Sequence, residues 1–307
     1  MTTEVRPTHW ANVAEGGFAL GMWVLYLVER FLGRWPFRVV LAPVVLFYVL
    51  KHRLARSSSA EYLTRVGITP SFRTSFRHIS GFAETIMDKT LAVAGQYPFH
   101  KLRFTGREVM LESMAQGKGG VLVTAHMGCL EVCRLAAERK DGPKLNVLVH
   151  TRHAEQFNAL LRRLDPHSQV KLIQVTDVAP ATAALLSQKV DAGEFVVIAA
   201  DRVPVSDASG RTVKVPFLGA EAAFPIGPWI LAAALKCQVI LFSVLHEDDT
   251  YRVRFEKLAE RVELPRGRRE AAAAEYVSLY AQRLELLCRQ SPYDWFNFFP
   301  FWEPPRA

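Results

Sequence analysis

The sequence has few cysteines and lacks the short motifs that mark several enzyme classes. None of its four cysteines forms a CxxC pair. Three of them lie in apolar segments, so we expect buried, reduced thiols in a protein that faces the cytosol. There is also no GxSxG nucleophile elbow and no HExxH metal site. These absences argue against a serine hydrolase with a catalytic triad and against zinc-dependent chemistry.

Acidic residues are in deficit. The chain of 307 residues has 30 acidic and 38 basic side chains, which gives a net charge of +8. Half of its residues are hydrophobic. This balance predicts an acidic partner, which would be an anionic lipid surface, an acidic carrier protein or a nucleic acid. The basic residues are scattered and do not form one stripe, so a nucleic-acid-binding module is the least favoured of the three.

No hydrophobic run has the ~20 residues that a membrane-spanning helix needs. Residues 16–28 and 39–50 form two shorter runs, and Pro43 lies inside the second. Tryptophan and tyrosine occur in and beside both runs. The pattern predicts two short helices that lie in the membrane interface, or one tilted span. The alternative is a hydrophobic helical hairpin that packs on the globular domain.

A basic cluster follows these runs directly. It consists of Lys51, His52, Arg53 and Arg56, and it suits an anionic lipid surface on the cytosolic side of a membrane. The cluster therefore favours membrane association. We expect a membrane-associating segment over residues 1–56 and an α/β domain over residues 57–307.

The rest of the chain alternates between strand-like and helix-like segments, which is typical of an α/β fold. We expect a mixed, largely parallel central sheet flanked by helices, behind an N-terminal hydrophobic helical membrane anchor. Residues 203–223 are predicted to form a long polar connection. The expected strands are 102–104, 119–124, 145–150, 170–175, 195–200, 239–245 and 251–255. The expected helices are 72–95, 107–116, 153–164, 179–192, 225–235 and 268–290.

The predicted helix at 72–95 has basic residues on a face away from its apolar positions. These are Arg73, Arg77 and His78. A solvated helix face is the favoured interpretation, and a site for an anionic headgroup is the alternative.

An apolar run ends in His126, and Glu131 follows five positions later. On one continuous helix this spacing means about 140° of rotation, so the two side chains would not share a face. A turn at Met127-Gly128 would instead let Glu131 reach back to the imidazole from the first turn of a helix. We therefore predict a strand–turn–helix junction, with His126 at the strand edge where ligands bind in α/β sheets.

Polar side chains follow three of the predicted strands. They are His126, the segment His150–Arg152, and the pair Asp201 and Arg202. If these strands are parallel neighbours, all three groups converge at one edge of the sheet. A histidine held by a carboxylate acts as a general base, because the carboxylate fixes its tautomer and stabilises the imidazolium.

The sequence shows no clear protein nucleophile for this base. Its natural use is therefore to deprotonate an acceptor hydroxyl that attacks a bound acyl group. The resulting oxyanion needs positive charge, which Arg152 or Arg202 would supply. Either arginine could instead bind an acidic substrate group or pair with a structural carboxylate.

The segment His126-Met127-Gly128-Cys129-Leu130-Glu131 matches the H-x4-D/E signature of the lysophospholipid acyltransferase superfamily. The chain most closely resembles the bacterial branch that contains the late acyltransferases of lipid A biosynthesis, and within it the predicted acyltransferases of aryl-polyene and fatty-acid-like gene clusters. Supporting segments occur in the same order: His9-Trp10, Leu32-Gly33-Arg34, Pro43, Asp201-Arg202, Val215-Pro216-Phe217-Leu218-Gly219, Phe224-Pro225-Ile226-Gly227-Pro228 and Asp294-Trp295-Phe296-Asn297-Phe298-Phe299.

The resemblance implies a membrane-associated O-acyltransferase on the cytoplasmic face of a bacterial inner membrane. His126 would be the general base, Glu131 its orienting partner, and Asp201 a further functional acid. Arg152, Arg202 and His150 are expected to bind substrate. The donor would be an acyl thioester of acyl carrier protein or coenzyme A, the acceptor a hydroxyl of a membrane lipid or glycolipid, with no metal or other cofactor. The alternatives are a lipid ester or thioester hydrolase, and a non-catalytic membrane protein that binds acylated carrier or lipid.

Overall fold

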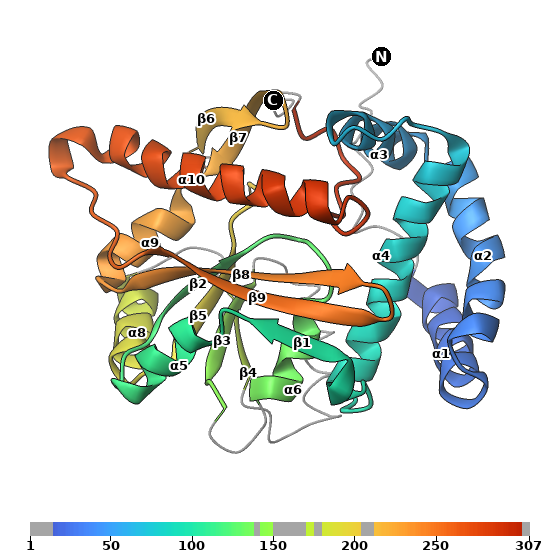
Figure 1. Cartoon of the computed structure of the whole chain (residues 1–307), viewed down its shortest axis with the longest axis horizontal. Coiled ribbons are helices and arrows are strands. Elements are labelled where there is room, and N and C mark those ends of the chain that lie inside the picture. The colour runs from blue at the N-terminus through green and yellow to red at the C-terminus, as the bar shows by residue number, and fades with distance from the viewer. Residues whose placement is uncertain (1–14, 138–141, 150–169, 175–179, 204–211, 303–307) are drawn as a thin grey trace, which may run out of the picture.

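The computed structural model describes residues 15–137, 142–149, 170–174, 180–203 and 212–302 (Figure 1). Its strands are β1 (Leu102–Thr105), β2 (Gly120–Thr124), β3 (Leu145–Val149), β4 (Val170–Gln174), β5 (Phe195–Ala199), β6 (Thr212–Phe217), β7 (Ala220–Pro225), β8 (Gln238–Glu247) and β9 (Thr250–Ala259). Its α-helices are α1 (Glu15–Leu32), α2 (Arg34–Lys51), α3 (Arg53–Arg65), α4 (Phe72–Val93), α5 (Glu108–Ala115), α6 (Arg134–Ala137), α8 (Pro180–Asp191), α9 (Gly227–Leu235) and α10 (Arg269–Gln290).

Seven of the described strands form one central sheet in the order β1-β9-β8-β2-β5-β3-β4. The five strands from β8 to β4 are parallel to one another. β9 returns antiparallel to β8 as a hairpin, and β1 is parallel to β9. The expected mixed, largely parallel sheet is therefore confirmed.

Helices cover both faces of this sheet (Figure 1). α8, α9 and α10 contribute to one hydrophobic core, and α4, α5 and α6 contribute to the other. β2 is buried on both of its faces: Val121 and Val123 pack in the first core, and Leu122 packs in the second. A strand buried on both faces is continuously apolar, as in parallel sheets generally.

The expected polar connection at residues 203–223 is wrong in its second half. Residues 212–225 form the antiparallel hairpin of β6 and β7 instead. The turn of this hairpin has Leu218 and Gly219 at positive φ, the left-handed conformation that tight hairpins need. The hairpin packs beside α10, at the top of the view in Figure 1.

The N-terminal hydrophobic segment forms α1 and α2, at the right edge of the view in Figure 1. α2 packs on α4 through one buried stripe, which consists of Phe37, Leu41, Val45 and Val49. Large apolar side chains on the other side of both helices are exposed, among them Trp23, Phe31, Trp35 and Phe47. None of the helices in the described ranges is both long and apolar enough to cross a bilayer, so the predicted anchor gains no support as a span.

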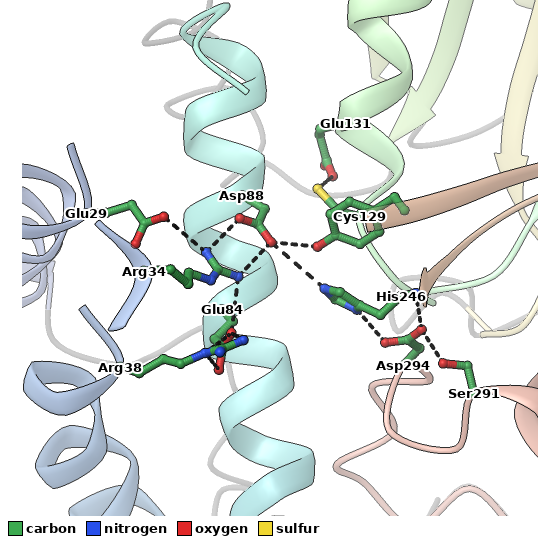
Figure 2. A network of polar contacts seen from close by, with 11 residues as sticks. Glu29, Arg34, Arg38, Glu84, Asp88, Cys129, Glu131, His246, Ser291 and Asp294 are labelled. Carbon is green, nitrogen blue, oxygen red and sulfur yellow. Dashed lines mark hydrogen bonds and ion pairs between the residues drawn. The ribbon is translucent and has the colours of Figure 1, made fainter. Parts of the chain in front are cut away.

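A partly buried ion pair ties α2 to α4 (Figure 2). Arg34 donates two hydrogen bonds to Asp88, of 2.8 and 3.0 Å, in the bidentate geometry that favours arginine over lysine. The hydroxyl of Tyr251, from β9, donates a further bond of 2.7 Å to Asp88. Asp88 therefore links the N-terminal helices to β9 of the central sheet.

Candidate active site

His126 lies two residues beyond the end of β2, at the carboxyl edge of the parallel strands. The turn that follows it is close to the backbone of β8. Gly128 has φ +58°, and a Cβ there would come within 1.8 Å of the carbonyl oxygen of Val244. Only glycine fits this turn, because both the backbone angle and the space exclude a side chain. The predicted turn at Met127-Gly128 is confirmed.

Asp201 is the hydrogen-bond partner of His126. The carboxylate accepts from the His126 backbone N–H over 3.0 Å, and its other oxygen lies 2.8 Å from Nδ1 of the imidazole. Sheet register explains the contact: Thr124 of β2 is paired with Ala199 of β5, and His126 and Asp201 each come two positions later. The predicted convergence of His126 and Asp201 at one edge of the sheet is therefore confirmed.

The Asp201 carboxylate is fully buried and receives a third hydrogen bond, from Nε1 of Trp295 over 3.0 Å. Burial acts to raise the pKa of Asp201. The charge and hydrogen bonds of His126 outweigh burial, however, and hold that pKa well below its usual value. Asp201 is therefore an anion with a fixed orientation.

This arrangement assigns the tautomer of His126. An ionised carboxylate only accepts hydrogen bonds, so Nδ1 carries a proton, and in the neutral form of the ring the lone pair is on Nε2. The His126 side chain is 46% exposed, and no residue of the described part of the chain bonds to Nε2. The side of the ring away from Asp201 can therefore meet a substrate.

Arg202 lies beside this pair. Its Nη2 donates a 2.7 Å hydrogen bond to the carbonyl oxygen of Phe296, and its guanidinium lies 5.2 Å from the ring centre of Phe299. Nε is 4.0 Å from Asp201 and has no hydrogen-bond partner among the described residues. The structure therefore places Arg202 in the site. His150 and Arg152 fall outside the described residues.

The family of the chain is decided by one comparison. The model of the bacterial lipid A biosynthesis acyltransferases matches residues 70–303. The chain belongs to this family. It is an acyltransferase that acts on lipid, as the resemblance of its sequence predicted. No curated protein matches the chain.

In this acyltransferase, Glu131 lies where expected along the chain but has a different partner. It falls in the first turn of a 3₁₀ helix, Leu130–Cys133. Its carboxylate forms an ion pair with Lys89 of α4, and the Cys129 thiol lies 3.9 Å away. Burial acts to raise the pKa of Glu131, but the Lys89 ammonium outweighs it and keeps that pKa below its usual value.

The expected contact between Glu131 and His126 is therefore not what orients the imidazole: Asp201 makes that contact. The physical reason is that Lys89 provides a closer opposite charge for Glu131, and that sheet register brings Asp201 to the ring. A functional role of Glu131 in this acyltransferase stays a prediction.

Residues 294–299, the aromatic C-terminal run, lie against the turn that contains His126. The sequence did not predict this contact. Trp295 pairs with Met127 as an isolated antiparallel bridge. The Phe296 N–H donates to the His126 carbonyl over 3.1 Å, and the Gly128 N–H donates to the Asp294 carbonyl over 2.9 Å. The run therefore acts as a short strand along the turn that presents His126.

A second histidine–aspartate pair lies next to this run (Figure 2). Asp294 accepts from both the backbone N–H and Nδ1 of His246, each over 2.6 Å, which repeats the way Asp201 holds His126. Nε2 of His246 faces Asp88 at 3.9 Å. Ser291 donates a further bond of 2.6 Å to Asp294. The histidine thus lies between two carboxylates and connects Asp88 of α4 to the C-terminal run.

The four cysteines of the acyltransferase are free and buried, as expected. Burial raises the pKa of the Cys129 thiol well above its usual value, which makes the thiolate unavailable as a nucleophile at neutral pH. Within the described residues, no cluster of three or more histidine, cysteine, aspartate or glutamate side chains could hold a metal ion.

Proposed function

We propose that this acyltransferase transfers a fatty acyl group from an acyl thioester to a hydroxyl of a lipid or glycolipid, with His126 as general base. The observation that carries the proposal is the geometry of His126: Nδ1 is held by a buried aspartate while the opposite side of the ring is exposed. This is the arrangement that a base needs to remove a proton from a bound alcohol.

The proposed reaction has two steps. Nε2 of His126 takes the proton of the acceptor hydroxyl as its oxygen attacks the thioester carbonyl, which forms a C–O bond and a tetrahedral oxyanion. Collapse of that intermediate breaks the C–S bond, and the leaving thiolate takes the proton back from the imidazolium. Asp201 stabilises the imidazolium in between, because its carboxylate is already ionised and oriented.

Arg202 is proposed to bind the reacting groups on the substrate. Its charge lies beside Asp201, and the Phe296 carbonyl fixes its position. A guanidinium in a buried setting stabilises a nearby oxyanion more strongly than in water. His150 and Arg152 are assigned to substrate binding on the sequence argument alone.

The donor is proposed to be acyl carrier protein or coenzyme A, without a metal or other cofactor. Both donors are acidic, which suits the net charge of +8. The acceptor side is proposed to be the cytoplasmic face of a bacterial inner membrane. The support for membrane association is the exposed apolar side of α1 and α2, which is the kind of face that amphipathic helices bury in a lipid interface.

The test compares the purified wild type with His126→Ala. The control variant is His100→Ala, which removes an exposed histidine of the 3₁₀ helix Phe99–Lys101. Each protein is given an acyl thioester of acyl carrier protein or of coenzyme A, with and without a bacterial lipid extract, and lipids and free fatty acid are measured by mass spectrometry. We expect His126→Ala to lose about a hundredfold or more of acyl transfer and His100→Ala to lose none.

Wild-type-like transfer by His126→Ala would refute the proposed base. Fatty acid released at the same rate with and without the lipid extract would indicate a hydrolase and refute the transfer. A transferase needs the acceptor for rapid turnover, so its thioester consumption rises when the extract is present.

A further inference from the structure

A cavity of about 440 Å³ lies between α2 and α4, apart from the His126 site. Arg38 lines it from α2, and Arg73 and Arg77 line it from α4. Three arginines from two helices therefore border one hollow. The sequence predicted a solvated face for Arg73, Arg77 and His78. Arg73 and Arg77 are indeed exposed, but His78 is fully buried and bonds to the Trp295 carbonyl.

Positive charge is in excess in this cavity. Glu84, its acidic lining residue, bonds to Arg38 with N–O distances of 3.0 to 3.2 Å. Glu84 also forms an ion pair with Arg34 over 3.2 Å, so its charge is already shared by two arginines. Within the described part of the chain, neither Arg73 nor Arg77 forms an ion pair. An anion would therefore neutralise charge that the protein itself leaves unpaired.

Arg77 is oriented for binding. Its guanidinium carbon lies 4.3 Å from the ring centre of Tyr293, which also lines the cavity. This cation–π contact positions the guanidinium, and its N–H groups form no hydrogen bond to the described residues, so they are available as donors. A phosphate group fits such donors, because guanidinium N–H pairs match the spacing of two phosphate oxygens. Ser80 adds a hydroxyl to the same lining.

Exposed apolar side chains of α2 lie on the helix beyond the lining residues Arg38 and Ala42. Trp35, Arg38, Ala42 and Leu46 follow one another at spacings of three and four residues, so they form one row along the helix. Trp35 is 75% exposed and Leu46 is 41% exposed. A ligand whose phosphate lies against the arginines would have apolar surface beside it for a hydrocarbon chain.

We infer that this cavity binds the phosphate group of an anionic lipid. The inference rests on the proposed membrane association, because it needs the exposed side of α2 to meet a lipid surface. The bound phosphate would add a polar contact to the apolar contact between α2 and the lipid. Arg73 and Arg77 hold the phosphate, Tyr293 orients Arg77, and the Trp35–Leu46 row lies against the acyl chains.

The experiment measures binding of dioctanoyl phosphatidic acid, a soluble lipid, to the full chain in a non-ionic detergent by native mass spectrometry. The variant is Arg73→Gln/Arg77→Gln. The matched control, Arg103→Gln/Arg107→Gln, removes the same charge from two exposed arginines, in and after β1, that do not line the cavity. We expect the Arg73/Arg77 variant to bind about tenfold more weakly or worse, and the control to bind as the wild type does.

Two further probes separate the sources of the binding energy. Dioctanoylglycerol has the chains without the phosphate and should bind more weakly than the phosphatidic acid. Inorganic phosphate that binds as tightly as the lipid would overturn the lipid part of the inference. Equal binding by the wild type and the Arg73/Arg77 variant, or equal losses in that variant and the control, would overturn the site.

This readout does not depend on catalysis. His126→Ala should bind the phosphatidic acid as the wild type does, so a failure of the proposed base leaves the lipid site testable. A failure of the lipid site, in turn, leaves the acyl-transfer assay unaffected.

Discussion

The indole Nε1 of Trp295 donates a hydrogen bond of 3.0 Å to the carboxylate of Asp201, although 94 residues separate the two. Both side chains are fully buried. The oxygen that accepts this bond also accepts the backbone N–H of His126. A residue of the aromatic C-terminal run therefore fixes the carboxylate that orients the proposed base, and this relationship can be tested.

Trp295→Phe should lower kcat by about tenfold with little change in KM, because it removes one donor to a charged carboxylate and keeps an aromatic ring in the core. The measurement is steady-state acyl transfer. Trp302→Phe is the matched control, since its indole N–H donates to the backbone carbonyl of Phe217 and not to Asp201. Equal losses in the two variants would show that general damage to the aromatic core, and not the Asp201 contact, causes the effect.

The two acidic residues near His126 should have separable effects on the imidazole. Asp201→Asn should lower kcat by about a thousandfold or more, because an amide there no longer fixes the tautomer. It should also abolish the downfield proton signal of Nδ1–H in NMR spectra of histidine-labelled protein. Glu131→Gln should keep that signal, because its carboxylate pairs with Lys89. If Glu131→Gln removes the signal and Asp201→Asn retains it, the assignment of partners made from the structure is wrong.

The stability of the fold should decline in mild alkali because of His246. Burial acts to lower the pKa of His246, but its bonds to Asp294 and Asp88 outweigh burial and raise that pKa to about 9 from an ordinary value of 6.5. The folded protein thus retains a proton that the unfolded chain releases. The stabilisation is complete below about pH 6.5, falls as the pH rises, and is lost above about pH 9.

Thermal denaturation between pH 6 and 9.5 checks this pH dependence. His246→Gln should flatten the decline, because glutamine carries no proton to release. An exposed histidine provides the control, and His100→Gln should keep the slope of the wild type. An unchanged slope in His246→Gln would mean that another group titrates.

The exposed side of α1 and α2 should contribute to membrane binding. Trp35→Ser/Phe47→Ser removes two side chains that are 75% and 62% exposed, so the substitution should change the stability of the fold little. We expect binding to vesicles of phosphatidylethanolamine and phosphatidylglycerol to weaken by about tenfold or more in a sedimentation assay. Leu111→Ser/Leu286→Ser changes two other exposed apolar residues and should have no such effect. The membrane proposal fails if the two double variants sediment alike.

The fold class and the positions of His126 and Asp201 at the strand ends could be predicted, because they depend on local patterns. Apolar runs followed by polar residues located β2 and β5, and parallel strands bring their ends together. The predicted strand–turn–helix junction and the family resemblance both indicate Glu131 as the orienting partner of His126. Asp201 takes that place because the register of β2 and β5 puts both residues two positions beyond the pair Thr124–Ala199, and local sequence patterns do not specify this register.

The remaining features depend on contacts between distant segments. The bridge between Met127 and Trp295 joins parts of the chain that no periodic pattern connects. His246 and Asp294 are single polar residues, and only the packing of β8 beside the C-terminal run brings them together. The β6–β7 hairpin did leave a signal, because Val213, Val215 and Phe217 occupy alternate positions before a Leu-Gly turn.

The pairing of residues 126–128 with residues 294–297 also has a consequence for synthesis of the protein. Strands β2 and β5 precede Trp295 in the chain, so they are synthesised before the residue that donates a hydrogen bond to Asp201. A nascent chain on the ribosome therefore contains His126 and Asp201 before the segment that holds them has been synthesised. The proposed active site is complete only after translation has passed residue 297.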